Sequence, residues 1–239
     1  MKEVIVIIPT YNESENITQI IESIFSIHQD INILVVDDNS PDGTSNKVKE
    51  VISKFNNKLN LITRNSKMGL GSAYLTGFKW AMNKGFEYVI SMDADFSHDP
   101  SDLLKLYNSC KNVNNDIAVG SRYVKGINVV NWPIERILLS YFASLYVRSI
   151  TFMPVKDPTS GFVCYTMKSI KKLNLENIRF NGYAFQIEMK FKLFLMKFNI
   201  IEVPIIFTDR KLGKSKLNSS IIGEALLGVI SMKLKSFFD

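Results

Sequence analysis

Residues 86–95 read Phe-Glu-Tyr-Val-Ile-Ser-Met-Asp-Ala-Asp, an apolar run that ends in two carboxylates. A short, continuous apolar run is typical of a strand buried on both faces of a parallel sheet. Asp93 and Asp95 would then follow its carboxyl end, two positions apart, where both can converge on one cation. Oxygen ligands suit Mg²⁺ or Mn²⁺, which commonly bind substrate phosphates as well. The segment predicts a metal-assisted enzyme acting on a phosphorylated donor, although Asp is also common in simple turns.

Comparable apolar runs recur along the first half of the chain and alternate with segments of helical periodicity. Strands are expected at residues 4–8, 31–36, 59–63, 88–92 and 116–120, and helices at about 17–25, 48–55, 69–84 and 100–110. This alternation favours an α/β fold with a central, mostly parallel sheet covered on both faces. Ligands of such sheets bind at the carboxyl ends of the strands. Asp38, Asp95 and Arg122 all follow expected strand ends, so one cleft is expected to hold them.

A different pattern follows Arg122. Residues 132–153 predict one long helix that is apolar around most of its circumference and is interrupted by Arg136 and Arg148. Such sparse polarity is typical of a core helix or of a helix lying at a membrane interface. Arg136 and Ser140 are four residues apart and therefore share one face of this helix.

The remaining segments predict a short strand, another helix and an edge strand. Residues 163–165 are strand-like, and residues 182–197 predict an amphipathic helix. Residues 200–207 predict a strand, and Pro204 within it places that strand at a sheet edge because proline cannot donate to a ladder.

Residues 221–238 form an apolar tail with helical spacing. We therefore expect a catalytic domain over residues 1–216, including the interfacial helix, followed by an amphipathic C-terminal tail over residues 217–239. No apolar run reaches the roughly 18–20 residues needed to cross a bilayer.

Composition narrows the function classes. Cys110 and Cys164 are the only cysteines and form no C-x-x-C motif, so we expect neither a disulfide framework nor a zinc site. His28 and His98 are the only histidines, and His98 is expected to support the site or be exposed rather than to bind the metal. The net charge of +6 suits nucleic acid, an anionic membrane or a phosphate-rich substrate. Because the lysines are scattered without interleaved aromatic residues, no nucleic-acid partner is expected.

Two glycine-containing segments are candidates for phosphate-binding loops. Gly69-x-Gly71 lacks the third glycine of a dinucleotide-binding motif, so a nicotinamide cofactor is not expected. The second segment carries a basic cluster, Arg210, Lys211, Lys214 and Lys216, around a glycine. Such a loop can fold over an anionic substrate and stabilise a leaving diphosphate, although a solvated basic segment explains the charge equally well.

Taken in order, the motifs resemble those of one family. They are Ile7–Glu13, Val36–Thr44, Gly69–Tyr74, Met92–Pro100, Gly120–Tyr123, Asp157–Phe162, Gly182–Glu188, Glu202–Ile205 and Asp209–Lys216. Each is weak alone, but together they span nearly the whole chain. The sequence resembles the dolichyl-phosphate (polyprenyl-phosphate) mannosyltransferases of glycosyltransferase family 2.

The resemblance implies a GT-A fold, which is Rossmann-like, with C-terminal interfacial helices, and it implies roles for matching residues. The donor would be held by Pro9, Tyr11, Glu13, Asp38, Asp93 and Asp95, and Mg²⁺ or Mn²⁺ by Asp93 and Asp95. The catalytic set would be Asp95, Arg122, Arg136, Ser140, Arg210 and Lys216, with Arg122, Arg136 and Ser140 on the acceptor phosphate. Ser97 stands where many relatives carry a metal-binding Gln, which leaves it as a candidate third ligand. Glu188 stands where the wider superfamily places a base and is expected to bind sugar or to be structural.

The implied reaction is inverting transfer of a hexose, with mannose from GDP-mannose favoured, to a polyprenyl or dolichyl monophosphate. Such an enzyme would be cytoplasmic and peripheral on the cytoplasmic face of a membrane, the ER membrane in a eukaryote, with a small membrane-anchoring subunit as a further candidate partner. Two alternatives stay open. One is a family-2 transferase with another nucleotide sugar or a soluble or polysaccharide acceptor, and the other is a non-catalytic nucleotide-sugar-binding protein.

Overall fold

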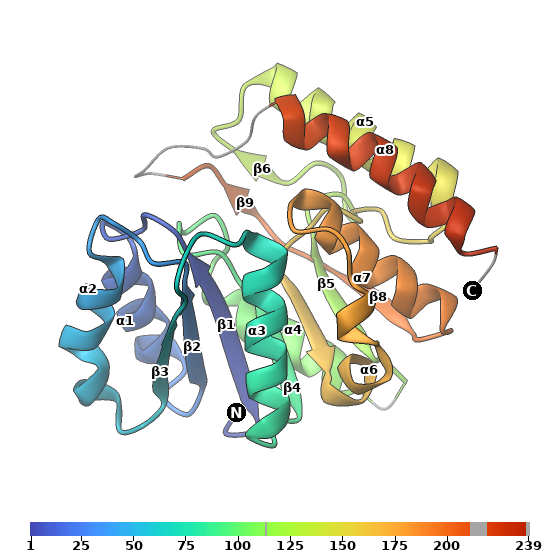
Figure 1. The fold of residues 1–239 in the computed structure, drawn as a ribbon. Coiled ribbons are helices and arrows are strands. Elements are labelled where there is room, and N and C mark those ends of the chain that lie inside the picture. The colour runs from blue at the N-terminus through green and yellow to red at the C-terminus, as the bar shows by residue number, and fades with distance from the viewer. Residues whose placement is uncertain (113, 211–218, 238–239) are drawn as a thin grey trace.

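The computed structural model describes residues 1–112, 114–210 and 219–237, with only the backbone described for 219–225. Within this part, seven strands form one sheet in the order β3-β2-β1-β4-β7-β5-β8 (Figure 1). The strands are β1 (Val4–Thr10), β2 (Asn32–Asp37), β3 (Leu59–Thr63), β4 (Tyr88–Ser91), β5 (Ile117–Ser121), β7 (Val163–Thr166) and β8 (Ile200–Pro204). The pairs that involve β7 are antiparallel and the others are parallel. The expected α/β fold with a mostly parallel sheet is confirmed.

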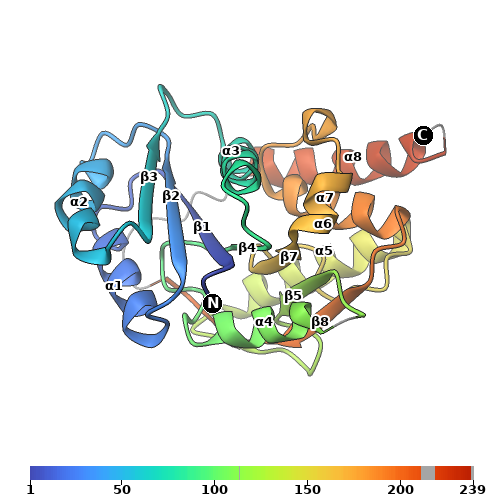
Figure 2. The ribbon, with the colours of Figure 1, turned by 90° about the horizontal axis from the view of Figure 1, so that it is seen from below.

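Helices cover both faces of the sheet (Figure 2). One face carries α1 (Ile17–Ile27), α2 (Thr44–Val51) with a 3₁₀ turn η1 (Ile52–Phe55), and α4 (Asp102–Lys111). The other carries α3 (Leu70–Asn83), α6 (Met167–Lys172), a 3₁₀ turn η2 (Leu175–Asn177) and α7 (Tyr183–Leu195). Each strand sends alternate apolar side chains into these two cores, which is why the strands read as continuous apolar runs.

A third apolar cluster joins three helices beyond the sheet. It contains Val147 of α5 (Ile134–Thr151), Ile187 and Phe191 of α7, and Val229 and Met232 of α8 (Ser219–Lys235). Other apolar side chains of the two helices are exposed, among them Leu138, Phe142 and Leu145 of α5 and Leu227 and Leu234 of α8. The division of the chain at residue 216 stays a prediction.

The short strand expected at 163–165 is confirmed as β7, and it lies antiparallel between β4 and β5, a position that the sequence does not predict. The strand expected at 200–207 ends at Pro204, and the chain then forms β9 (Phe207–Thr208) in a small parallel pair with β6 (Val129–Val130). The edge position predicted for Pro204 is confirmed, since β8 ends the order of strands.

Candidate active site

A cavity of about 410 Å³ lies at the carboxyl ends of the central strands and beneath α5. It brings together seven of the predicted site residues: Asp93, Asp95, Ser97, Arg122, Arg136, Ser140 and Arg210. Apolar side chains of three helices line the rest, including Leu139 of α5, Ile187 of α7 and Leu226 of α8. The cavity therefore joins a charged end to an apolar wall.

Asp93 and Asp95 lie in the turn that follows β4. One oxygen of Asp95 accepts a hydrogen bond from the backbone N–H of Ser97 at 3.1 Å, and the other forms an ion pair with Arg210 at 2.9 Å. The intervening Phe96 has a φ of +60°, a conformation that costs energy for a bulky residue and is typical of functional turns. The turn is held in a shape that presents two carboxylates to the cavity.

The carboxylates fit a divalent cation that is shared with a substrate. Among the described residues, no group of three or more His, Cys, Asp or Glu side chains could hold a metal by itself. Mg²⁺ usually keeps several waters and is bound by one or two carboxylates plus substrate phosphates. Asp93 and Asp95 therefore match a cation that is completed by a diphosphate, and Ser97, which lines the cavity, stays a candidate third ligand.

His98 supports this turn from below. It is almost fully buried, its ring stacks on Phe162, and its Nδ1 accepts the backbone N–H of Asp93 at 3.2 Å. Burial lowers the pKa of His98 to about 4, with Asp95 opposing the shift and Arg122 adding to it. A neutral imidazole is what an accepting Nδ1 requires.

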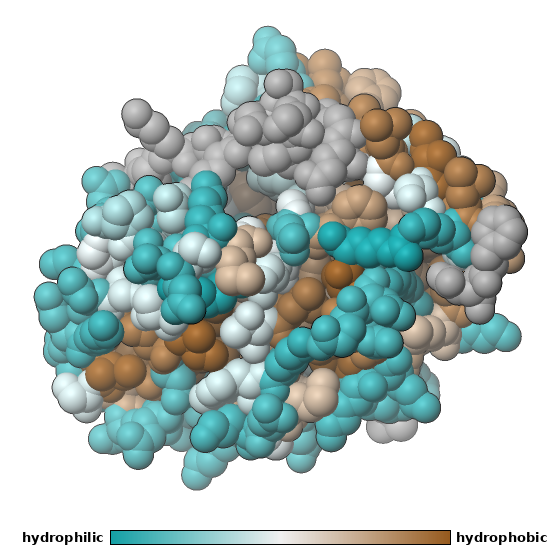
Figure 3. Space-filling view, viewed as in Figure 1, coloured by the Kyte–Doolittle hydropathy of each residue, from teal (hydrophilic) through white to brown (hydrophobic). Residues whose placement is uncertain are grey.

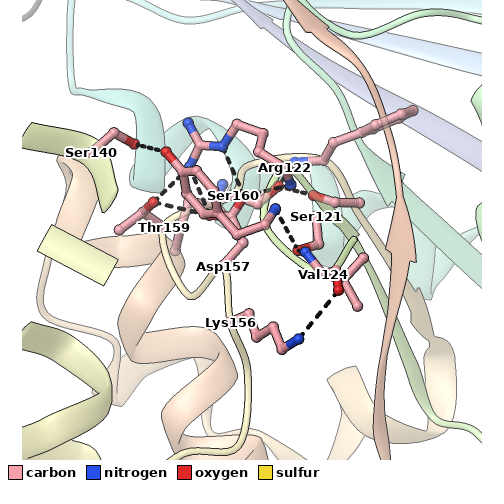
Figure 4. A network of polar contacts seen from close by, with 12 residues as sticks. Ser121, Arg122, Val124, Ser140, Lys156, Asp157, Thr159 and Ser160 are labelled. Atoms are coloured by element: carbon pink, nitrogen blue, oxygen red, sulfur yellow. Dashed lines mark hydrogen bonds and ion pairs between the residues drawn. The ribbon is translucent and has the colours of Figure 1, made fainter. Parts of the chain in front are cut away.

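Arg122 is held by Asp157, the first residue of the Asp157–Phe162 motif, for which the sequence predicts no role. Both oxygens of Asp157 accept from the guanidinium at 2.7 Å, and Thr159 accepts from Nη2 at 2.7 Å (Figure 4). Burial alone would raise the pKa of Asp157, but the charge and hydrogen bonds of Arg122 outweigh it and hold the pKa below its ordinary range. The pair fixes the guanidinium at the cavity wall and cancels much of its charge.

Arg136 and Ser140 enter the cavity from α5. The Nη1 of Arg136 pairs with Asp209 at 2.7 Å, and its guanidinium lies 4.1 Å from the ring centre of Trp132. Ser140 accepts a hydrogen bond from the hydroxyl of Tyr123 at 2.7 Å. Both side chains line the cavity, so the shared helix face that their four-residue spacing predicts is confirmed.

The other donor-binding candidates lie at the ends of β1 and β2. Backbone N–H groups of the β1 loop are tied to side chains of the β2 loop, Glu13 to Thr44 at 3.0 Å and Asn12 to Ser40 at 3.0 Å. Pro9 lies near the end of β1, and Tyr11 is the first residue after it. The Nζ of Lys67 lies 4.3 Å from the ring centre of Tyr11.

Asp38 accepts hydrogen bonds from the chain through both of its carboxylate oxygens. It pairs with Arg64, which is buried, and its second oxygen accepts the backbone N–H groups of Met68 and Gly69 at 3.0 and 3.1 Å. Arg64 also reaches Ser72 and the carbonyl of Gly69. The sequence reasoning missed Arg64, although an arginine directly after the expected strand at 59–63 was a usable signal.

Two predicted residues stand apart. Lys216 lies outside the described residues. Glu188 proves to be structural: one oxygen accepts the backbone N–H groups of Arg179 and Phe180 at 2.9 and 3.1 Å, and the other pairs with Lys192 at 3.0 Å.

Known proteins share this architecture. The structure of glucosyl-3-phosphoglycerate synthase from Mycobacterium tuberculosis with Mn²⁺, UDP and glucosyl-3-phosphoglycerate superposes with a TM-score of 0.66 at 17% identity, over 98% of this chain and 78% of that one. The likeness shows the fold, which is of the expected GT-A type. The family described as glycosyl transferase family 2 matches residues 5–179, and the chain belongs to that family.

Two curated relatives are similar over most of their length. Polyprenol monophosphomannose synthase of Mycolicibacterium smegmatis is 39% identical over 98% of this chain and 88% of that protein. Undecaprenyl-phosphate mannosyltransferase of Micrococcus luteus is 37% identical over 95% of this chain and 92% of that protein. The expectation of a glycosyltransferase resembling the polyprenyl-phosphate mannosyltransferases is confirmed.

Proposed function

We propose that this chain transfers mannose from GDP-mannose to the phosphate of a polyprenyl or dolichyl monophosphate, with inversion at the sugar carbon. The observation that carries the proposal is the make-up of the cavity, in which carboxylates and arginines share one space with apolar side chains of α5, α7 and α8. A lipid phosphate likewise combines a charged head group with an apolar chain, so it matches the charged and apolar parts of the cavity. The names of the two bacterial relatives support both the sugar and the acceptor class.

On this proposal the donor lies across the ends of β1, β2 and β4. Pro9, Tyr11, Glu13 and Asp38 hold the nucleoside, and Asp93 and Asp95 hold Mg²⁺ or Mn²⁺ with the diphosphate. A cation held by Asp93 and Asp95 would offset the repulsion between the two carboxylates and the diphosphate and would stabilise the leaving group.

The acceptor phosphate meets Arg122, Arg136 and Ser140. A phosphate monoester has its second pKa near 6, so it is already largely deprotonated at neutral pH and needs no strong base. One of its oxygens attacks the anomeric carbon while the bond from that carbon to the diphosphate breaks and GDP leaves. The chain contributes positioning and charge stabilisation, with Arg210 and Lys216 placed on the departing diphosphate.

The protein would meet its lipid at a membrane surface. Apolar side chains of α5 and α8 are exposed together, among them Phe142 at 58% and Leu227 at 73%, and Figure 3 shows this apolar surface on the side of the molecule that carries the two helices. Within the described residues, no helix has the length and apolar character required to pass through a bilayer. We propose peripheral binding on the cytoplasmic face, the ER membrane in a eukaryote, with or without a small anchoring subunit.

The test is a donor and acceptor panel with purified protein. GDP-mannose, UDP-glucose and other labelled nucleotide sugars are each combined with a short polyprenyl phosphate or a soluble sugar, with Mg²⁺, Mn²⁺ or EDTA. Metal-dependent, lipid-linked mannose from GDP-mannose alone is the expected product. Product only on the sugar acceptor would favour a soluble-acceptor transferase, and donor binding without turnover would favour a non-catalytic protein.

A further inference from the structure

Lys190 of α7 is buried beneath the cavity, and the proposed reaction gives it no role. Its side chain is 0% exposed, and its Nζ donates to the carbonyl oxygens of Ser160 and Gln186, both at 2.8 Å. Gln186 lies one turn earlier on the same helix, whereas Ser160 belongs to the loop before β7. Burying a lysine costs several kcal/mol unless the ammonium is compensated, so its position calls for an explanation.

The loop that Lys190 reaches is the one that holds Arg122. Ser160 lines the cavity together with Thr159, its hydroxyl donates to the carbonyl of Gly120 at 2.6 Å, and its backbone N–H donates to the carbonyl of Asp157 at 3.3 Å. The ammonium therefore anchors a short segment whose other end binds the guanidinium.

Charge gives Lys190 a second consequence. The charged groups that face it are Asp157 from the loop before β7, Arg122 from the end of β5, and Glu202 of β8. Glu202 is half-buried and accepts the backbone N–H groups of Lys156 and Asp157 at 2.8 and 3.0 Å, so it belongs to the same group of charges. With Lys190 protonated these four side chains sum to zero, and with Lys190 neutral they carry one net negative charge, which would repel a phosphate.

We propose that Lys190 is a positioning residue for the acceptor phosphate, anchoring the Asp157–Ser160 loop through the Ser160 carbonyl and keeping the group of charges behind Arg122 from becoming net negative. The inference rests on the proposed function, because it takes the phosphate to lie against Arg122 and Arg136. Lys190 itself does not line the cavity. It acts on the phosphate indirectly, by holding the loop in place and through the electrostatic field of its ammonium charge.

The role predicts a pH dependence of acceptor binding. Burial lowers the pKa of Lys190 to about 7, with Asp157 opposing the shift and Arg122 adding to it. The lysine is then charged below about pH 7, where its contribution to acceptor binding is largest, and it loses its charge above that pH. The second ionisation of the acceptor phosphate, near pH 6, changes affinity in the opposite direction, but it is identical in every variant and cancels in a ratio.

The experiment compares Lys190→Met, which removes charge and donor, with Lys190→Gln, which removes the charge and keeps a donor. Acceptor KM, donor KM and kcat are measured from pH 6.5 to 8.5, and each variant is melted to verify folding. Relative to the unaltered protein, the acceptor KM of Lys190→Gln should rise about tenfold at pH 6.5 and converge on the unaltered value by pH 8.5. Lys190→Met also loses the donor to the Ser160 carbonyl, so its acceptor KM should stay raised at pH 8.5, and donor KM should be unchanged in both variants. Lys190→Arg should keep a low acceptor KM at pH 8.5.

The matched control is Lys172→Met, which removes one exposed lysine at the end of α6. A KM ratio that is the same at every pH, or an equal effect of Lys172→Met, would overturn the role of the charge. A normal acceptor KM in Lys190→Met at every pH would overturn the inference entirely. If the unaltered protein makes no lipid-linked product, both the proposed function and this inference fail. If it makes that product and the Lys190 variants show the same dependence of acceptor KM on pH, only this inference is refuted.

Discussion

Arg210 and Asp95 form an ion pair in which Nη2 lies 2.9 Å from Oδ2. An arginine therefore occupies one oxygen of a carboxylate that we propose as a ligand of the cation. The preceding residue, Asp209, pairs with Arg136 at 2.7 Å. Two adjacent residues thus connect the turn after β4 to α5. On the proposed function, a cation at Asp95 would compete with Arg210, which would then be available to the diphosphate, and a phosphate at Arg136 would compete with Asp209.

Arg210→Ala should therefore tighten metal binding while lowering turnover. Without donor, removing the competing guanidinium should strengthen Mn²⁺ binding by about fivefold, which corresponds to ~1 kcal/mol for a partly exposed ion pair, as measured by calorimetric titration. Asp95→Asn should abolish the binding. Lys105→Ala, which breaks the Lys105–Asp102 pair on α4, is the control and should leave Mn²⁺ affinity unchanged. Weaker Mn²⁺ binding in Arg210→Ala would contradict the competition.

Arg136→Ala should raise the acceptor KM, by about tenfold or more, because a planar guanidinium is suited to a phosphate. Donor KM should stay nearly constant. Steady-state kinetics with a short polyprenyl phosphate gives both constants. Arg179→Ala removes an exposed arginine and serves as the control. A loss of donor affinity with normal acceptor kinetics would place Arg136 at the donor instead.

Asp157→Asn should destabilise the fold by about 3–5 kcal/mol, because it leaves the guanidinium of Arg122 buried without its counter-charge. The pKa of Asp157 is lowered in the folded state, so its stabilisation is complete above the unfolded value of about 4 and is lost as pH falls towards the folded pKa. Chemical denaturation between pH 2.5 and 7 measures both effects. The difference between the two proteins should shrink with acidity, and a constant difference would refute the linkage. Asp30→Asn, at an exposed pair with Lys58, should have little effect.

Phe142→Asp combined with Leu227→Asp should weaken binding to anionic liposomes, because exposed apolar side chains on α5 and α8 would enter the lipid interface. Flotation at low and high salt measures the binding, and activity on a short, soluble acceptor should persist. Leu104→Asp alters an exposed apolar residue of α4 and should float like the unaltered protein. Equal flotation of all variants would count against this surface.

Gly77→Ala should destabilise the protein by about 1–3 kcal/mol. A Cβ at Gly77 would lie 2.7 Å from the side chain of Ile7, where α3 packs on β1, so strand and helix would have to separate. The free energy of unfolding in denaturant is the measurement. A Cβ at Gly161 would meet its nearest neighbour, Gln186, at 3.6 Å, and Gly161→Ala should therefore be close to neutral for stability.

The sequence was informative wherever the structure follows local rules. Continuous apolar runs located the parallel strands, and the polar residues after them, such as Asp95 and Arg122, do meet at one cavity because parallel strands end at one edge. The two-residue spacing of Asp93 and Asp95 and the four-residue spacing of Arg136 and Ser140 fixed their relative positions without any knowledge of the fold.

Pairings between distant segments could not be predicted in this way. Nothing local joins Arg122 to Asp157 or Asp38 to Arg64, since each pair forms only after the sheet has been assembled. Lys190 reads as an ordinary position on an amphipathic helix, and its burial depends on the loop before β7. The apolar residues of α5 left a core helix and an interfacial helix equally open, and only the fold shows that Phe142 and its neighbours are exposed.

The position of β7 has a consequence for how the chain folds. Strands β4 and β5 follow each other in sequence with only α4 between them, yet neither can pair with the other, because β7 fills the gap between them. A chain that emerges from the ribosome N-terminus first can join β1 to β4, but β5 has no neighbour on that side until residues 163–166 arrive. Loops that close late and over long distances slow folding. The two halves of the sheet should therefore be joined in a late step, and a chain ended before β7 should retain a structured first half with an open sheet edge.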